Sequence, residues 1–175
     1  MTDLRYPVGK FHRPDHVAAE DWESAIDSIA ALPKAMRGVV AGLTAEQLET
    51  PYRPSGWTVR QVVHHVPDSH LQAYTRCKLA LTEDEPTIKP YDEARWAELP
   101  DTAGTPVSTS LALLDALHER WVVLLRGLPE SARARTFRHP ETGVWRIDTL
   151  VMLYAWHGQH HLSHITRLRE RSGWR

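Results

Sequence analysis

Apolar residues recur with a helical period of three to four positions along four stretches of the 175-residue chain. Turn signals separate these stretches and predict helices over 17–43, 58–81, 108–128 and 148–171. Pro33 is expected to interrupt or kink the first helix, and Thr58 is the expected N-cap of the second. Four amphipathic helices around one core predict an all-α four-helix bundle, in a single domain that spans residues 1–175.

The connections between the predicted helices carry further information. Residues 44–48 are expected to form a short turn after the first helix. The connection over 83–106, between the second and third helices, holds four prolines and many acidic residues, and connections of this length often contribute to a binding site. Its length leaves room for a crossover, so a simple up-and-down order of helices is not required. Pro140 to Gly143 form a turn signal that predicts a short hairpin over 137–145.

Composition narrows the class of protein. The chain is 42% hydrophobic and 25% charged, a globular balance that excludes disorder. A net charge of -1 gives no support for nucleic acid or an anionic membrane as a partner. No apolar run reaches ~18 residues, the first residues lack the apolar core of a signal peptide, and Cys77 has no second cysteine to pair with. These features predict a cytoplasmic location.

Histidine is the residue type whose placement suggests chemistry. The chain holds eleven histidines, several of them in the fourth predicted helix. At ~100° per residue, His161 projects about 40° and His157 about 80° from the centre of the apolar face, so both face inward. His164 lies at the margin of that face, about 100° from its centre. His160 lies about 140° from the centre and is expected to point toward water. A single histidine on an apolar face is ordinarily a hydrogen-bonded core residue. Two histidines spaced i, i+4 can converge on one metal ion. Gly158 between them suggests that something approaches closely there.

A catalytic metal site needs a third ligand from another helix. The second helix offers His64, His65 and His70. His65 lies about 120° from the centre of the valine stripe and His64 about 140°, a difference too small to choose between them. His70 projects close to the centre, but Pro67 intervenes and makes the extrapolation unsafe. From spacing alone, the third ligand stays open among these three.

Four segments together resemble the DinB/YfiT superfamily, most closely its YfiT-type branch of metal-dependent hydrolases. They are GWTVRQVVHHVPDSH, TEDEPTIKPYDEARWAEL, SLALLDALHERWVVLLR and YAWHGQHHLSHIT. The resemblance implies an unusual four-helix bundle, often dimeric, that binds zinc or nickel through three histidines. It matches the upstream ligand to His65 and the terminal pair to His157 and His161. His164 stands where the family commonly has glutamine, and Pro67 stands where it has a small helix former.

The resemblance implies a metal-dependent enzyme that acts on a small molecule by activating water or a low-molecular-weight thiol. Hydrolysis is the first expectation, with one divalent ion per chain, zinc before nickel. The superfamily also contains thiol S-transferases, so transfer of a bacillithiol-type thiol to an electrophile is the alternative. A non-catalytic, metal-binding dimer is an alternative of another class. In every case we expect a homodimer and no nucleic-acid or membrane partner.

Several other side chains are candidates for a substrate pocket. They belong to the second and third predicted helices and are Asp68, Tyr74, Arg76, Arg120 and Trp121. Each has an ordinary alternative role as a surface charge or a core residue. Cys77 is expected to be a small buried residue and not a nucleophile, because no basic partner is evident beside it. The connection over 83–106 is expected to lie near the metal end of the bundle.

Overall fold

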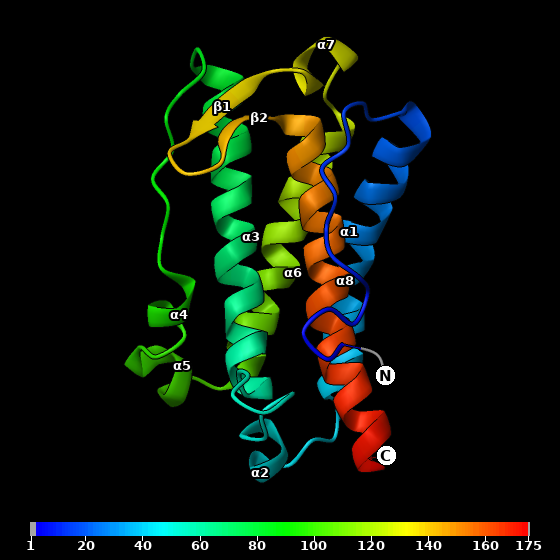
Figure 1. Cartoon of the computed structure of the whole chain (residues 1–175), viewed down its shortest axis with the longest axis vertical. Coiled ribbons are helices and arrows are strands. Elements are labelled where there is room, and N and C mark those ends of the chain that lie inside the picture. The colour runs from blue at the N-terminus through cyan, green and yellow to red at the C-terminus, as the bar shows by residue number, and fades with distance from the viewer. Residues whose placement is uncertain (1–2, 175) are drawn as a thin grey trace.

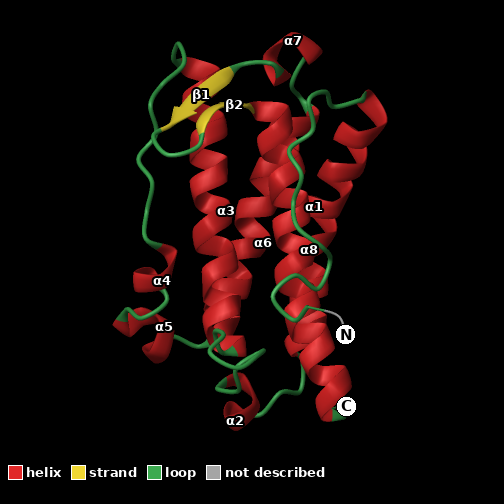
Figure 2. Ribbon diagram, in the orientation of Figure 1, coloured by secondary structure: helices red, strands yellow, loops and turns green. Residues whose placement is uncertain are grey.

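The computed structural model describes residues 3–174 and consists mainly of four long helices (Figures 1 and 2). These are α1 (Ala19–Val40), α3 (Val59–Thr82), α6 (Val107–Arg126) and α8 (Ile147–Ser172). The connections hold the remaining elements, which are α2 (Ala45–Leu48), α4 (Glu93–Trp96), α5 (Pro100–Gly104), α7 (Glu130–Arg133), β1 (Thr136–His139) and β2 (Gly143–Arg146). The predicted all-α four-helix bundle is confirmed.

The ends of the long helices fall within a few residues of the predicted ones. Pro33 does not interrupt α1, which stays helical from Ala19 to Val40, and Pro67 lies inside α3 in the same way. A proline removes one backbone hydrogen bond from a helix, and packing against neighbouring helices can hold the helix together across that gap. The carbonyl oxygen that would have accepted the missing bond is left free for another donor.

The bundle has a crossover. α1 packs against α6 and α8, and α3 packs against the same two helices, so α1 and α3 lie at diagonal positions although they follow each other in the chain. Figure 1 shows α1 and α8 running in one direction and α3 and α6 in the other. Because α3 and α6 are parallel, the connection between them must return along the full length of the bundle, and this explains why it is long.

The connection between α3 and α6 is hydrogen-bonded near its start to the hairpin formed by β1 and β2. Its backbone pairs with β1, since the Ile88 amide donates to the Arg138 carbonyl and the Arg138 amide donates to the Pro86 carbonyl, each at 2.9 Å. The predicted hairpin is also confirmed, with β1 and β2 antiparallel and Phe137 opposite Trp145. One end of the bundle is therefore closed by two segments that are distant in the sequence but hydrogen-bonded to each other.

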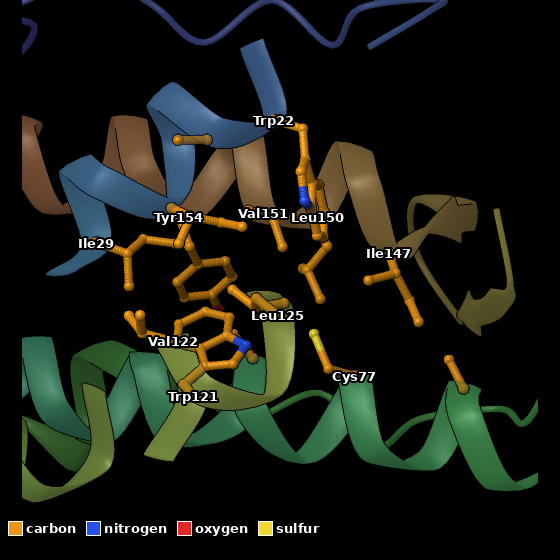
Figure 3. Close-up of a cluster of buried hydrophobic side chains, with 14 of the residues drawn as sticks. Trp22, Ile29, Cys77, Trp121, Val122, Leu125, Ile147, Leu150, Val151 and Tyr154 are labelled. Carbon is orange, nitrogen blue, oxygen red and sulfur yellow. The ribbon is translucent and has the colours of Figure 1, made fainter. Parts of the chain in front are cut away.

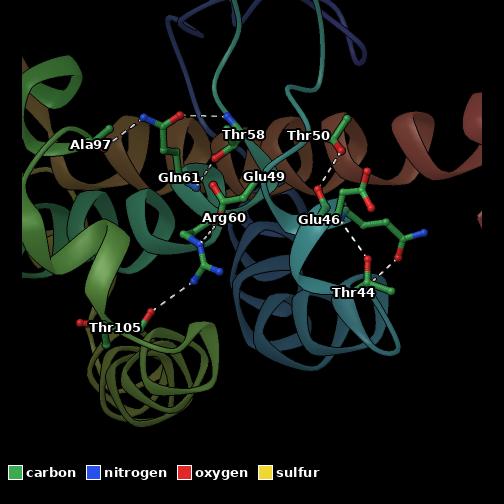
Figure 4. Close-up of polar contacts among 10 residues, drawn as sticks. Thr44, Glu46, Glu49, Thr50, Thr58, Arg60, Gln61, Ala97 and Thr105 are labelled. Atoms are coloured by element: carbon green, nitrogen blue, oxygen red, sulfur yellow. Dashed lines mark hydrogen bonds and ion pairs between the residues drawn. The ribbon is translucent and has the colours of Figure 1, made fainter.

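A hydrogen-bonded cap fixes where α3 begins. The Thr58 side chain accepts from the Gln61 amide at 3.1 Å, and the Gln61 side chain accepts from the Thr58 amide at 2.9 Å (Figure 4). This reciprocal pair confirms Thr58 as the N-cap. The Gln61 side chain also donates to the Ala97 carbonyl at 3.1 Å. The cap thus joins the start of α3 to the end of α4, and it helps to hold the connection against the bundle.

The core is divided into two apolar clusters. The first lies toward the hairpin end and includes Trp22, Trp121 and Ile147, several of which are drawn in Figure 3. The second lies toward α2 and includes Met36, Val62 and Ile165. Within residues 3–174, no helix is long and apolar enough to cross a membrane. The candidate site lies between the two clusters and draws its side chains from α3 and α8.

Candidate metal centre

Three histidines converge between the two core clusters. His65 projects from α3, and His157 and His161 project from successive turns of α8. One ring nitrogen from each lies within 4.8 Å of the others, and Nε2 of His65 is 3.2 Å from Nε2 of His157. The structure therefore brings together the three residues that the resemblance selected. Of the three candidates left open by spacing, His65 alone joins this cluster. Nδ1 of His64 instead lies 2.7 Å from the Ser110 hydroxyl on α6.

The donor set fits one divalent ion. Two nitrogens bound to one tetrahedral zinc at ~2.05 Å are separated by about 3.3 Å, close to the spacing between the His65 and His157 rings. Enclosure in the bundle lowers the pKa of His65 to about 4 and holds the pKa of His157 and His161 well below the ordinary value, so the imidazoles are neutral near pH 7. Neutral imidazoles present the lone pairs that zinc and nickel accept.

An open pocket of about 430 Å³ leads to the cluster. Its walls come from the start and middle of α3, the connection after α3, the hairpin and α8, and they include Trp57, Arg76, Tyr91, Glu93 and Glu141. Trp57 lies against two of the three histidines, with its ring centroid 4.6 Å from that of His65 and 6.3 Å from that of His161. The 83–106 connection was expected near the metal end of the bundle, and its residues Pro90, Tyr91 and Glu93 do line the pocket beside the histidines. The histidines themselves lie between the two core clusters and not at an end of the bundle. The pocket has the size of a small-molecule site.

Of the five pocket candidates, only Arg76 lines the pocket. Trp121 is fully buried in the core, 5.9 Å from Tyr154 between ring centroids (Figure 3). Tyr74 lies beneath the Arg120 guanidinium, and Asp68 is not among the lining residues. For these four the ordinary alternative role, away from the pocket, fits the structure. The sequence shows which helix a residue is on but not which neighbour it faces, so it could not separate them from Arg76. Cys77 is buried, and burial raises the pKa of its thiol to about 12, so it is not a nucleophile.

The prediction that His160 points toward water is wrong. His160 is only 9% exposed, and its ring stacks on Trp156 with centroids 4.6 Å apart. The N-terminal segment covers this face of α8, since the Trp156 indole donates to the Gly9 carbonyl at 3.2 Å and the Tyr6 ring lies 6.3 Å from the His160 ring. His160 also lines the pocket that leads to the triad. The helical wheel could not show this, and the N-terminal segment has no helical period from which its position could be inferred.

His164 and Gly158 also differ from expectation in their surroundings. His164 is 3% exposed and stacks on the Tyr52 ring, with centroids 3.9 Å apart, so it is a core residue and not a marginal one. The close approach at Gly158 comes from α1. A Cβ atom at that position would lie 2.5 Å from Cδ2 of Leu32. The presence of glycine at position 158 is therefore explained by the tight packing of α1 on α8 and not by the histidine cluster.

The fold and the site together define a helical bundle with an inward-facing histidine triad that opens to a small-molecule pocket. Residues 28–165 match the family model of the DinB superfamily, and the chain belongs to this family. A solved structure of YfiT from Bacillus subtilis, described as "a probable metal-dependent hydrolase with an unusual four-helix bundle topology", superposes with a TM-score of 0.96 at 44% identity. The match covers 99% of this chain and 100% of that one.

Other relatives agree with this placement. A Bacillus cereus protein (strain B4264) named "Putative metal-dependent hydrolase" is 52% identical over 174 residues, which is 99% of this chain and 100% of the relative. A Bacillus mycoides protein (strain KBAB4) of the same designation has the same identity and coverage. The four-helix bundle protein TT2238 shares the fold, with a TM-score of 0.60 at 21% identity over 83% of this chain and 98% of that one.

Proposed function

We propose that this chain is a metal-dependent hydrolase that holds one divalent ion with His65, His157 and His161. The observation that carries the proposal is the convergence of three neutral imidazoles at the floor of an open pocket. Relatives with 52% identity are named for metal-dependent hydrolysis, which supports the same class of reaction. Zinc is the metal we expect first, because three histidines with an open position are typical of catalytic zinc sites.

The ligand count favours catalysis over a purely structural metal. A structural zinc site is ordinarily closed by four protein ligands, often cysteines. Within residues 3–174, the cluster contains three histidines and no fourth histidine, cysteine or carboxylate. The lone Cys77 is buried in the first core cluster and not in the triad. An ion held by three imidazoles keeps a position free for a ligand that enters from the pocket.

A bound divalent ion would lower the pKa of water, or of a thiol, enough to make either a nucleophile near neutral pH. The protein's own part is to cover one side of the His65 ring with Trp57 and to orient the substrate in the pocket. Arg76 suits the second task. Its Nε atom is buried and has no hydrogen-bond partner within the described residues. An arginine in this condition would bind a carboxylate or another anionic group of the substrate.

Metal analysis of variants tests the ligand assignment. We expect about one zinc per chain in the wild type after dialysis, and a 10–100-fold or greater loss of affinity when any one of the three histidines is replaced by alanine. His64→Ala is the matched control, because His64 is also buried on α3 but bonds to Ser110 outside the cluster. Full zinc retention in a folded His161→Ala protein would refute the assignment.

Activity assays separate hydrolysis from thiol transfer, which is the second candidate. Activated esters and amides, with and without added zinc, report hydrolysis. Bacillithiol, mycothiol and glutathione, each supplied with an electrophilic bimane, report S-transfer. Metal-dependent turnover of an ester without any thiol supports the hydrolase. Turnover that requires a thiol supports the transferase. Stoichiometric zinc with neither activity across the panel would favour the non-catalytic alternative.

A further inference from the structure

Two further histidines lie behind the triad and connect it to the backbone of α1. Nδ1 of His157 is 3.2 Å from Nε2 of His70, and Nδ1 of His70 is 2.9 Å from Nε2 of His118. Nδ1 of His118 is 2.6 Å from the carbonyl oxygen of Ile29. His70 is 0% exposed and His118 is 1% exposed. The three rings therefore form one continuous hydrogen-bonded chain, which we call the histidine relay.

The far end of the relay depends on a proline. In an α-helix, the Ile29 carbonyl would accept a hydrogen bond from the amide of residue 33, four positions later. Residue 33 is proline and has no amide hydrogen, so that carbonyl has no donor of its own helix at this position. The His118 ring on α6 supplies the donor. Pro33 inside α1 thus creates the acceptor on which the relay ends.

The Ile29 carbonyl, at the far end of the relay, sets the direction of every hydrogen bond in it. A carbonyl oxygen only accepts, so His118 must carry its proton on Nδ1. A neutral imidazole has one protonated nitrogen, so Nε2 of His118 accepts, and His70 must donate from Nδ1. The same reasoning makes Nε2 of His70 an acceptor and Nδ1 of His157 a donor. The lone pair of His157 then lies on Nε2, the nitrogen that is 3.2 Å from Nε2 of His65.

Both inner rings are neutral, as this reasoning requires. Burial disfavours the charged form of an imidazole that has no counter-ion, and His70 and His118 are 0% and 1% exposed. Neither ring has a carboxylate as a hydrogen-bond partner, and both also pack against the Trp121 ring, with centroids 5.9 and 6.0 Å away. A reversal of the relay would leave a nitrogen and the Ile29 oxygen facing each other without a hydrogen.

We propose that His70 and His118 are positioning residues that hold His157 in the Nδ1-protonated tautomer, with Nε2 free to bind the metal. Histidine ligands ordinarily obtain this support from a carboxylate or a carbonyl directly. Here two imidazoles stand between the ligand and the carbonyl, and they join α8, α3, α6 and α1 in one hydrogen-bonded path. The role of the metal in this proposal rests on the proposed function. The tautomer of His157, however, is a property of the metal-free chain and can be measured on its own.

Nitrogen NMR of the metal-free protein, with ¹⁵N-labelled histidine, reports the tautomer of each ring. The His157 signals are assigned by their loss in His157→Ala. We expect a protonated Nδ1 and an unprotonated Nε2 at His157 in the wild type. The test variant is His118→Phe, which keeps a ring in the core but removes both nitrogens. We expect it to populate the other tautomer at His157 and to bind zinc 10–100-fold more weakly.

The matched control is His64→Phe, the same substitution at a buried histidine outside the relay, and it should change neither the tautomer nor zinc affinity. An Nε2-protonated His157 in the wild type overturns the relay even if zinc binds, and this result does not depend on whether His118→Phe folds. Unchanged tautomer and affinity in folded His118→Phe also overturn it. The expected tautomer in a wild type that binds no zinc would instead refute the proposed function and leave the relay standing.

Discussion

Replacement of Gly158 by alanine should destabilise the protein, although alanine is the better helix former. A Cβ atom at position 158 would lie 2.5 Å from Cδ2 and 3.2 Å from Cδ1 of Leu32, and both distances are shorter than ordinary carbon contacts. Leu32 is 1% exposed and packed within the second core cluster, so it has little room to move. Either Leu32 must leave its preferred rotamer or α1 must move away from α8.

The two opposing effects can be compared. Overpacking of a filled core costs about 1–3 kcal/mol. Exchange of glycine for alanine inside a helix returns about 0.5–1 kcal/mol. We therefore expect Gly158→Ala to lower the free energy of unfolding by about 1 kcal/mol, the difference between the midpoints of these two ranges. Because Gly158 follows His157 directly, a shift of α8 would also disturb the triad and weaken zinc binding.

Urea denaturation followed by circular dichroism, with a chelator present, measures this change. Gly38→Ala is the matched control, because Gly38 is also inside a helix but a Cβ there would meet nothing within 4 Å. It should raise the free energy of unfolding by a few tenths to about 1 kcal/mol. On a Leu32→Ala background, the cost of Gly158→Ala should largely disappear. If Gly158→Ala stabilises the protein as Gly38→Ala does, the packing argument is wrong.

Three further predictions address the cap, the pH dependence and assembly. Thr58→Ala should lower the free energy of unfolding by about 1 kcal/mol through loss of the N-cap, and an unchanged urea midpoint would contradict the cap. The metal-free protein should lose stability as the pH falls from ~6.5 toward 4, because the unfolded chain takes up protons that buried His65 and His118, with pKa near 4, do not. Each such histidine contributes a slope of up to about 1.4 kcal/mol per pH unit, and equal urea midpoints at pH 7 and pH 5 would rule this out. Light scattering should give a homodimer, twice the 20.0 kDa of one chain, and a clean monomer would count against the family expectation.

The parts of this molecule that could be predicted are those with a local cause. The helix period placed four long helices, the Thr58 cap marked the start of one of them, and the turn residues marked the hairpin. The i, i+4 spacing of His157 and His161 pointed to a shared site because both are on one helix. Selection of His65 over its neighbours required the family resemblance, since the helical wheel could not separate them.

The features that could not be predicted depend on contacts between distant segments, and no sequence pattern indicates which segments meet. The burial of His160 is caused by the segment that includes Tyr6 and Gly9, which has no regular period. The relay depends on how α6 and α1 approach α3, and on the missing amide of Pro33. In the sequence, Pro33 and Pro67 both suggested an interruption of a helix. At Pro33, the more informative property proved to be the carbonyl that it leaves free.

The crossover has a consequence for how the chain reaches this structure. In an up-and-down bundle, consecutive helices pair as hairpins and can form early from local contacts. Here α1 and α3 are diagonal, and α3 meets α6 only after a connection that spans the bundle. α8 packs against α1 and α3, both far away in the sequence. High contact order slows folding, so this bundle should fold more slowly than its helix content suggests, and the triad should assemble only when α8 docks.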